Sequence, residues 1–228
     1  MPRRELILPG GKTIPPSVKF QENMVFYAPL NKGDLTDWIS GETGATSQDA
    51  SVVWDDNVGM YLLSFNSTLL GHDCTALRFT SPQLQANLSG IESRCTVFMI
   101  LKEVSVVGGY RSCRYFSCDT MKDVWERSPR SNICIDPRWM GQSAIDFNLK
   151  TIALVVENGR QRCYVNGHYV TDDQWADSLA TPVSLGICDK NGHQTDTSSS
   201  YNVSQCSLYV KDVRVYNRTL SASEIAEL

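Results

Sequence analysis

Long apolar runs are absent from this sequence of 228 residues. The longest ones, at 96–101 and 152–156, are far shorter than the roughly 20 apolar residues that a membrane-spanning helix needs. A secretory leader is also missing, because the apolar run at 6–8 is followed at once by a proline and two glycines. We therefore expect a protein that is made in the cytoplasm without a signal peptide and does not insert into a membrane.

Patterns typical of catalytic and metal sites are lacking as well. The sequence has no HExxH motif, no GxSxG motif and no CxxC spacing, and its three histidines lie in polar, turn-like contexts. The eight cysteines lie mostly in strand-like runs, where a free thiol packs as a small hydrophobe, although an even number also permits a disulfide framework. We expect mostly free, buried thiols, no zinc, no catalytic residues and hence no enzyme.

Basic charge is scarce over the chain as a whole. The net charge of −4 argues against a general nucleic-acid-binding protein. Residues 1–20 are the exception, because their four basic residues and one acidic residue give +3 and leave −7 for the rest. Prolines and glycines prevent regular strand pairing there. We predict that 1–20 is an arm lying against its own domain or a neighbouring subunit, with Arg3, Arg4 and Lys12 as assembly contacts.

The carboxyl-terminal stretch carries the clearest local pattern. Polar and apolar residues alternate over 208–216, which predicts a strand with one buried face. The alternation changes parity near Lys211 and Asp212, which indicates a β-bulge. Ser221 and Glu224 have the spacing of a capping box and predict a short closing helix. All of these features serve to close a fold, and none is typical of a binding site.

Short strand-like runs recur along the rest of the chain, and Asn158-Gly159 marks a tight hairpin. With almost no helix, this pattern predicts an all-β protein, a two-sheet antiparallel β-sandwich (jelly roll) with a short C-terminal helix, formed by one domain over 21–228. A helical turn is expected within 82–93, and strands are expected at 24–30, 51–54, 60–65, 76–79, 95–103, 110–118, 124–127, 132–136, 151–157, 160–166 and 182–187.

Several motifs are shared with a known family. VRVYNRTLSASEIAEL at 213–228 resembles the C-terminal signature of laminin G-like jelly-roll domains, in the concanavalin A-like lectin and glucanase superfamily. YVNG at 164–167, PVSLGI at 182–187 and DWISG at 37–41 resemble that family's penultimate hairpin, following strand and opening D-x-S-G element. The resemblance covers about residues 22–228. The ExDxxE strand of the glucanase branch is absent, so the resemblance implies binding rather than hydrolysis.

Aromatic and arginine side chains are the candidates for glycan recognition, which needs an apolar platform and a few polar groups. We predict a glycan-binding set of Arg111, Arg114, Tyr115, Trp125 and Trp139. The alternatives are that the tryptophans pack in the core and that the arginines lie on a solvated strand face.

A calcium site is a second candidate. Asp189, Asn191 and Asp196, within the polar stretch 189–200, could supply oxygen ligands of the kind that calcium prefers. Some laminin G-like domains bind calcium at the rim, as the resemblance implies. A plain surface loop is the alternative, and no other cofactor is expected.

Together these features lead to the hypothesis of a non-catalytic recognition and attachment module. It would be a glycan- or surface-binding subunit of a larger assembly such as a phage virion, in the role of decoration protein, head fibre or tail appendage. Its partners would be other protein subunits, through the arm, and cell-surface glycans. A purely structural cementing protein and a glycan-active enzyme with an unrecognised site are the two alternatives.

Overall fold

The computed structural model describes residues 8–66, 74–108, 113–118, 133–135, 147–174, 182, 184–190 and 203–228. Short 3-10 helices lie at Pro9–Gly11 and Gln21–Asn23. The helices and strands are β1 (Met24–Ala28), β2 (Ala50–Asp55), β3 (Met60–Asn66), β4 (Leu77–Phe79), α1 (Pro82–Asn87), β5 (Arg94–Gly108), β6 (Cys113–Cys118), β7 (Ile133–Ile135), β8 (Lys150–Glu157), β9 (Arg160–Val165), β10 (His168–Gln174), β11 (Leu185–Lys190), β12 (Val203–Tyr216) and α2 (Ala222–Ile225).

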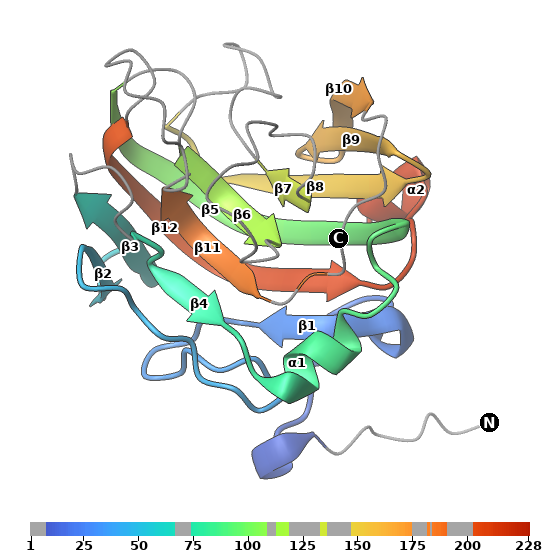
Figure 1. Ribbon diagram of the computed structural model, residues 1–228, viewed down its shortest axis with the longest axis horizontal. Coiled ribbons are helices and arrows are strands. Elements are labelled where there is room, and N and C mark those ends of the chain that lie inside the picture. Colours follow the sequence, from blue (N-terminus) through green and yellow to red (C-terminus); the bar gives the residue numbers. More distant parts are fainter. Residues whose placement is uncertain are drawn as a thin grey trace.

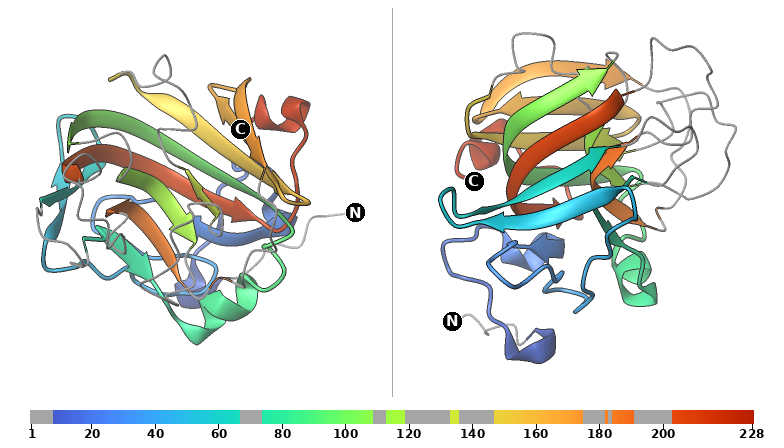
Figure 2. Two further views of the ribbon diagram at one scale, coloured as in Figure 1. Left: turned by 45° about the horizontal axis from the view of Figure 1, so that its top comes forward. Right: turned by 90° about the vertical axis from the view of Figure 1, so that its left-hand side faces the viewer.

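The strands form two antiparallel sheets that face one another (Figure 1). The large sheet has the order β10-β9-β8-β5-β12-β3-β2, and β1 also pairs with β12. The small sheet has the order β4-β11-β6-β7 and forms a separate layer, as the left view of Figure 2 shows. The structure thereby confirms the predicted β-sandwich. The strand expected at 124–127 lies outside the described residues.

Strand β12 is the centre of the large sheet, because it pairs with β5, β3 and β1. The expected bulge is present: the register shifts between Lys211 and Arg214, and Asp212 adopts a φ of 57°. The capping box of Ser221 and Glu224 at the start of α2 is confirmed as well. Asn158, at a φ of 48°, lies in the tight turn that joins β8 to β9, as predicted.

The main core lies between the two sheets. It holds the inward-facing residues of β5 and β8 together with aromatic residues from β1, β4 and β6, such as Phe26, Phe79 and Phe116, all of which are fully buried. The rings of Phe26 and Phe79 meet edge to face at 5.0 Å between centroids. Burial of apolar surface, aliphatic and aromatic, is the main favourable contribution to the stability of such a sandwich.

A second apolar cluster lies on the outer face of the large sheet and is covered by the N-terminal segment. Leu8, Ile14 and Val18 are buried against the outward-facing residues Phe98 and Val155, and Ile225 of α2 joins the same cluster. The described part of the predicted arm, residues 8–20, therefore packs on its own domain. Prolines and glycines exclude strand pairing in this segment, but they do not prevent its spaced apolar side chains from burying.

The DWISG element at 37–41 is held by a buried carboxylate. Asp37 accepts hydrogen bonds from the backbone N–H groups of Tyr27 at 2.9 Å, Ile39 at 3.1 Å and Ser40 at 3.0 Å, and also from the Ser40 hydroxyl. Burial raises the pKa of Asp37, although these hydrogen bonds oppose the rise. This element is therefore a structural turn that fixes the chain after β1.

Five cysteines carry buried thiols that form no disulfide: Cys74, Cys95, Cys118, Cys163 and Cys188. The expectation of buried thiols outside disulfides is confirmed for these five, whereas Cys206 is disulfide-bonded. Burial raises the pKa of the Cys163 thiol to about 12 and also raises the pKa values of Cys95 and Cys188. Such thiols are poor nucleophiles. No helix in the described part of the chain is long and apolar enough to cross a membrane.

Candidate ligand-binding surface

The predicted glycan-binding residues do not form a surface site in the described structure. Tyr115 is fully buried and its hydroxyl donates a hydrogen bond to the carboxylate of Glu103, so its ring is not exposed as a platform. Arg114, the neighbouring residue of β6, is also buried. Both side chains are parts of the folded interior, which corrects their assignment to the surface. Arg111, Trp125 and Trp139 lie outside the described residues.

The first calcium candidate is engaged in a buried polar cluster on the small sheet. The two carboxylate oxygens of Asp189 accept hydrogen bonds from the hydroxyls of Thr75 at 3.0 Å and Ser117 at 3.1 Å. A guanidinium N–H of Arg78 donates to the same Thr75 hydroxyl at 2.7 Å. These bonds tie β4, β6 and β11 together. Asn191 and Asp196 lie outside the described residues, and no metal-binding group of side chains occurs among the residues that are described.

Of the predicted assembly contacts, only Lys12 is described. Its ammonium lies 2.7 Å from the Asp34 carboxylate and 5.2 Å from the centre of the Trp38 ring. The indole N–H of Trp38 donates to the same carboxylate at 2.9 Å. Lys12 therefore holds the N-terminal segment on its own domain. Arg3 and Arg4 lie outside the described residues.

The large sheet offers a different surface that sequence reasoning missed. The N-terminal segment and α2 cover only one half of its outer face, over β1, β8 and the adjoining parts of β5 and β12. The outward-pointing residues of the other half are exposed or half-buried in the described structure. We call this half the open face and define it by its outward-pointing residues, Ser51, Val53, Asp55, Leu62, Ser64, Lys102, Ser105, Ser207, Tyr209 and Lys211.

A row of four serines crosses the open face. Ser51 of β2 pairs with Ser64 of β3, which pairs with Ser207 of β12, which in turn pairs with Ser105 of β5. Strands in a sheet lie about 4.8 Å apart, so the row extends over roughly 14 Å. The hydroxyls of Ser51 and Ser64 are 2.7 Å apart. Each hydroxyl can both donate and accept, and the row therefore presents repeated hydrogen-bonding groups to a ligand.

An apolar row runs directly beside the serines. Val53 pairs with Leu62, Leu62 with Tyr209 and Tyr209 with Lys102. Val53 is 56% exposed. The Tyr209 hydroxyl donates to the Asp55 carboxylate at 2.5 Å, which holds the ring in place on the sheet. Together the two rows combine apolar contact area with fixed polar groups, as small-molecule and glycan sites require.

A hollow lies at the other end of the same outer face, between α2 and the turn that joins β9 to β10. It is an open depression with a volume of about 500 Å³. Asn166 is fixed there, because its side-chain oxygen accepts the backbone N–H of Thr151 at 2.9 Å. The lining residues are Thr151, Asn166, Gly167, His168, Ile225, Ala226 and Leu228. The exposed His168 is the only histidine among the described residues.

Comparison with known proteins shows the fold. No family model matches the sequence, and a search of curated proteins gives no match. Solved structures that are similar include botulinum neurotoxin type C, which depends on interaction with two ganglioside molecules to enter cells (11% identity, TM-score 0.60). They also include the binding domain of botulinum neurotoxin DC in complex with SialylT (11% identity, TM-score 0.58) and with rat synaptotagmin II (10% identity, TM-score 0.60).

Each of these matches covers 90% of this chain but only 50% of the neurotoxin chain. This chain therefore spans about half the length of its structural neighbours. At such low identity the likeness establishes a shared β-sandwich and nothing about shared site residues. The neighbours are receptor-binding domains of toxins. The likeness does not test the laminin G-like motifs, and that family assignment stays a prediction.

Proposed function

We propose that this chain is a non-catalytic, lectin-like binding module of the laminin G-like type, and that a glycan binds to its open face. The observation that carries the proposal is the row of Ser51, Ser64, Ser207 and Ser105 beside the exposed apolar row that contains Tyr209. The fold is that of domains which bind gangliosides, a sialyl glycan and a receptor protein, and this supports a binding role.

Attachment to a larger assembly, such as a phage virion, belongs to the same proposal. Because Lys12 is paired within its own domain, the attachment contacts would be made by residues that precede it, including Arg3 and Arg4. Size-exclusion chromatography with mass determination tests this part. An oligomer that dissociates when both arginines are replaced by alanine would support it, and a monomer at all concentrations would contradict it.

A glycan array followed by titration tests the binding role. The variant Ser207→Leu removes one central hydroxyl of the serine row and fills the space above the sheet. We expect it to weaken binding of the selected glycan by about tenfold or more, which corresponds to at least about 1.4 kcal/mol. Ser89→Leu is the matched control, because Ser89 is an exposed serine that follows α1, outside the large sheet.

Two results would contradict the proposal. One is the absence of specific binding to any glycan on the array, which would favour a purely structural role. The other is a glycan whose affinity is the same for the wild type and for Ser207→Leu, which would place its site elsewhere on the protein.

A further inference from the structure

Two lysines lie together on the open face. Lys102 of β5 pairs with Tyr209 of β12, and Lys211, two residues further along β12, pairs with Ile100 of β5. Lys102 and Lys211 are therefore diagonal neighbours on the same side of the sheet. Such positions are about 7–8 Å apart, within reach of long side chains. Two ammonium groups can thus approach one anionic group from neighbouring strands.

Neither lysine is neutralised by the described part of the protein. Lys102 and Lys211 form no ion pair with any described residue. The carboxylates on and near these strands are engaged with other groups. Glu103, which follows Lys102 on β5, is buried and binds Lys150 and Tyr115. Asp212 binds the Arg214 guanidinium through both oxygens, and Asp55 accepts the Tyr209 hydroxyl, a hydrogen bond that lowers the pKa of Asp55. Asp55 therefore remains ionised on the open face. With two lysines and one aspartate, the net charge of the open face is about +1.

Two like charges at neighbouring positions of a sheet repel each other and lower stability slightly. This arrangement is not the consequence of a generally basic composition, because the chain has a net charge of −4. An anionic ligand between the two ammonium groups would remove the repulsion. The serine row and the Tyr209 ring lie beside the lysines and would contact the neutral part of the same ligand.

We propose that the open face selects acidic glycans, with a sugar carboxylate held between Lys102 and Lys211. This inference rests on the proposed function and adds the chemical class of the ligand. Sialic and uronic acids share the required chemistry, a carboxylate on a hydroxyl-rich ring. The same chemistry can reach the protein as the headgroup of a glycolipid in a membrane or as a soluble acidic polysaccharide.

Calorimetric titration with an acidic oligosaccharide and with its carboxyl-reduced, neutral form tests the proposal. We expect wild-type protein to prefer the acidic form by about tenfold, and this preference to fall as salt is added. Lys102→Met and Lys211→Met keep most of the apolar side chain but remove the charge. Each should reduce affinity for the acidic form by about threefold to tenfold and leave affinity for the neutral form unchanged.

Lys19→Met is the matched control, because Lys19 is an exposed lysine on the N-terminal segment that covers the other half of the sheet. It should change neither affinity. Vesicles with and without a sialylated glycolipid identify the source of the carboxylate: binding only to sialylated vesicles indicates a membrane headgroup, and binding to the soluble acidic oligosaccharide indicates a polysaccharide.

The outcomes separate this inference from the proposed function. Equal affinity for the acidic and neutral oligosaccharides, or a preference that survives both lysine variants, overturns the selection of acidic glycans and leaves glycan binding intact. No binding to either oligosaccharide or to the vesicles, together with an array on which nothing binds, overturns both.

Discussion

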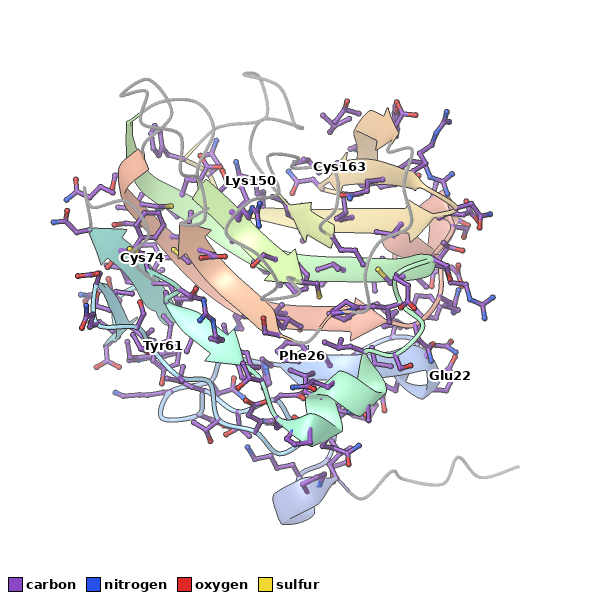
Figure 3. The ribbon with its side chains drawn as sticks, viewed as in Figure 1. Glu22, Phe26, Tyr61, Cys74, Lys150 and Cys163 are labelled. Carbon is purple, nitrogen blue, oxygen red and sulfur yellow. The ribbon has the colours of Figure 1, made fainter. Side chains whose placement is uncertain are left out.

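A buried ion pair between the sheets offers the sharpest test of the structure. Lys150, the first residue of β8, places its ammonium 3.3 Å from the Glu103 carboxylate of β5, and the two side chains are only 2% and 0% exposed. Lys150 is labelled in Figure 3. The Tyr115 hydroxyl from the opposite sheet donates to the same carboxylate oxygen. Lys150→Met leaves the Glu103 carboxyl group in the core without its cationic partner, at a cost of about 3–5 kcal/mol.

Urea unfolding measures this cost, and thermal unfolding should show a midpoint that is lower by about 6–20 °C for a chain of this length. A triple variant, Glu103→Leu, Lys150→Met and Tyr115→Phe, replaces all three polar groups with apolar groups of similar size. It should regain most of the lost stability, because the desolvation cost of both charges is removed with them. The reasoning is refuted if Lys150→Met costs less than about 1 kcal/mol at an unchanged m-value, or if the triple variant is as unstable as the single one.

Two further predictions concern charged residues of the last strand and helix. Arg214→Lys should lower the free energy of unfolding, measured with urea, by about 1–3 kcal/mol. Lysine cannot reproduce the two hydrogen bonds to Asp212, at 2.6 and 2.5 Å, or the stacking over Phe98. A variant as stable as the wild type would contradict this prediction. The pKa of Glu224 is lowered from its ordinary 4.5 to about 2, mainly by the Arg218 hydrogen bond. The stabilisation that ionised Glu224 gives the folded state is therefore complete above pH 4.5 and is lost as the pH falls through about 2. Because the two side chains are each 29% exposed and water screens their attraction, Glu224→Gln should lower the free energy of unfolding by only about 1 kcal/mol at neutral pH. The difference should disappear below pH 2, and a difference independent of pH would contradict the prediction.

Local features of the fold were predictable because their causes are local. The turn at Asn158-Gly159 follows from the ability of these residues to adopt positive φ, and the cap of α2 follows from the spacing of Ser221 and Glu224. The bulge at Asp212 was visible as a change of parity in the sequence. Each of these signals lies within a few neighbouring residues, so the alignment of distant strands was not needed.

The open face was not predictable in the same way. Its serine row joins positions 51, 64, 105 and 207, which become neighbours only when β12 pairs with β3 on one side and β5 on the other. A single sequence fixes which residues of a strand share a face, but not the register between strands that are distant in the chain. Tyr115 illustrates the same limit, because the sequence gives no sign that Glu103 would receive its hydroxyl in the core.

For the N-terminal segment, the sequence left open whether it lies against its own domain or a neighbouring subunit. Its prolines and glycines correctly excluded regular strands, but they said nothing about packing, since an irregular segment can still bury side chains. The spacing of Leu8, Ile14 and Val18 was the available signal. These residues cover one half of the outer face, so the described outward-pointing residues of β12 that reach solvent, such as Tyr209 and Lys211, lie on the other half.

The bulge in β12 separates the part of the strand that contributes to the open face from the part that lies under the N-terminal segment. Before the bulge, Ser207, Tyr209 and Lys211 point outward on the open face. After it, Arg214 points outward beneath the covered half, stacked on Phe98. Without the extra residue, the inward-facing Val213 and Val215 would exchange places with Arg214 and Tyr216, which would bring a guanidinium into the core. The closing strand therefore both completes the core and supplies the central residues of the proposed binding surface, and the positive φ of Asp212 makes the two roles compatible.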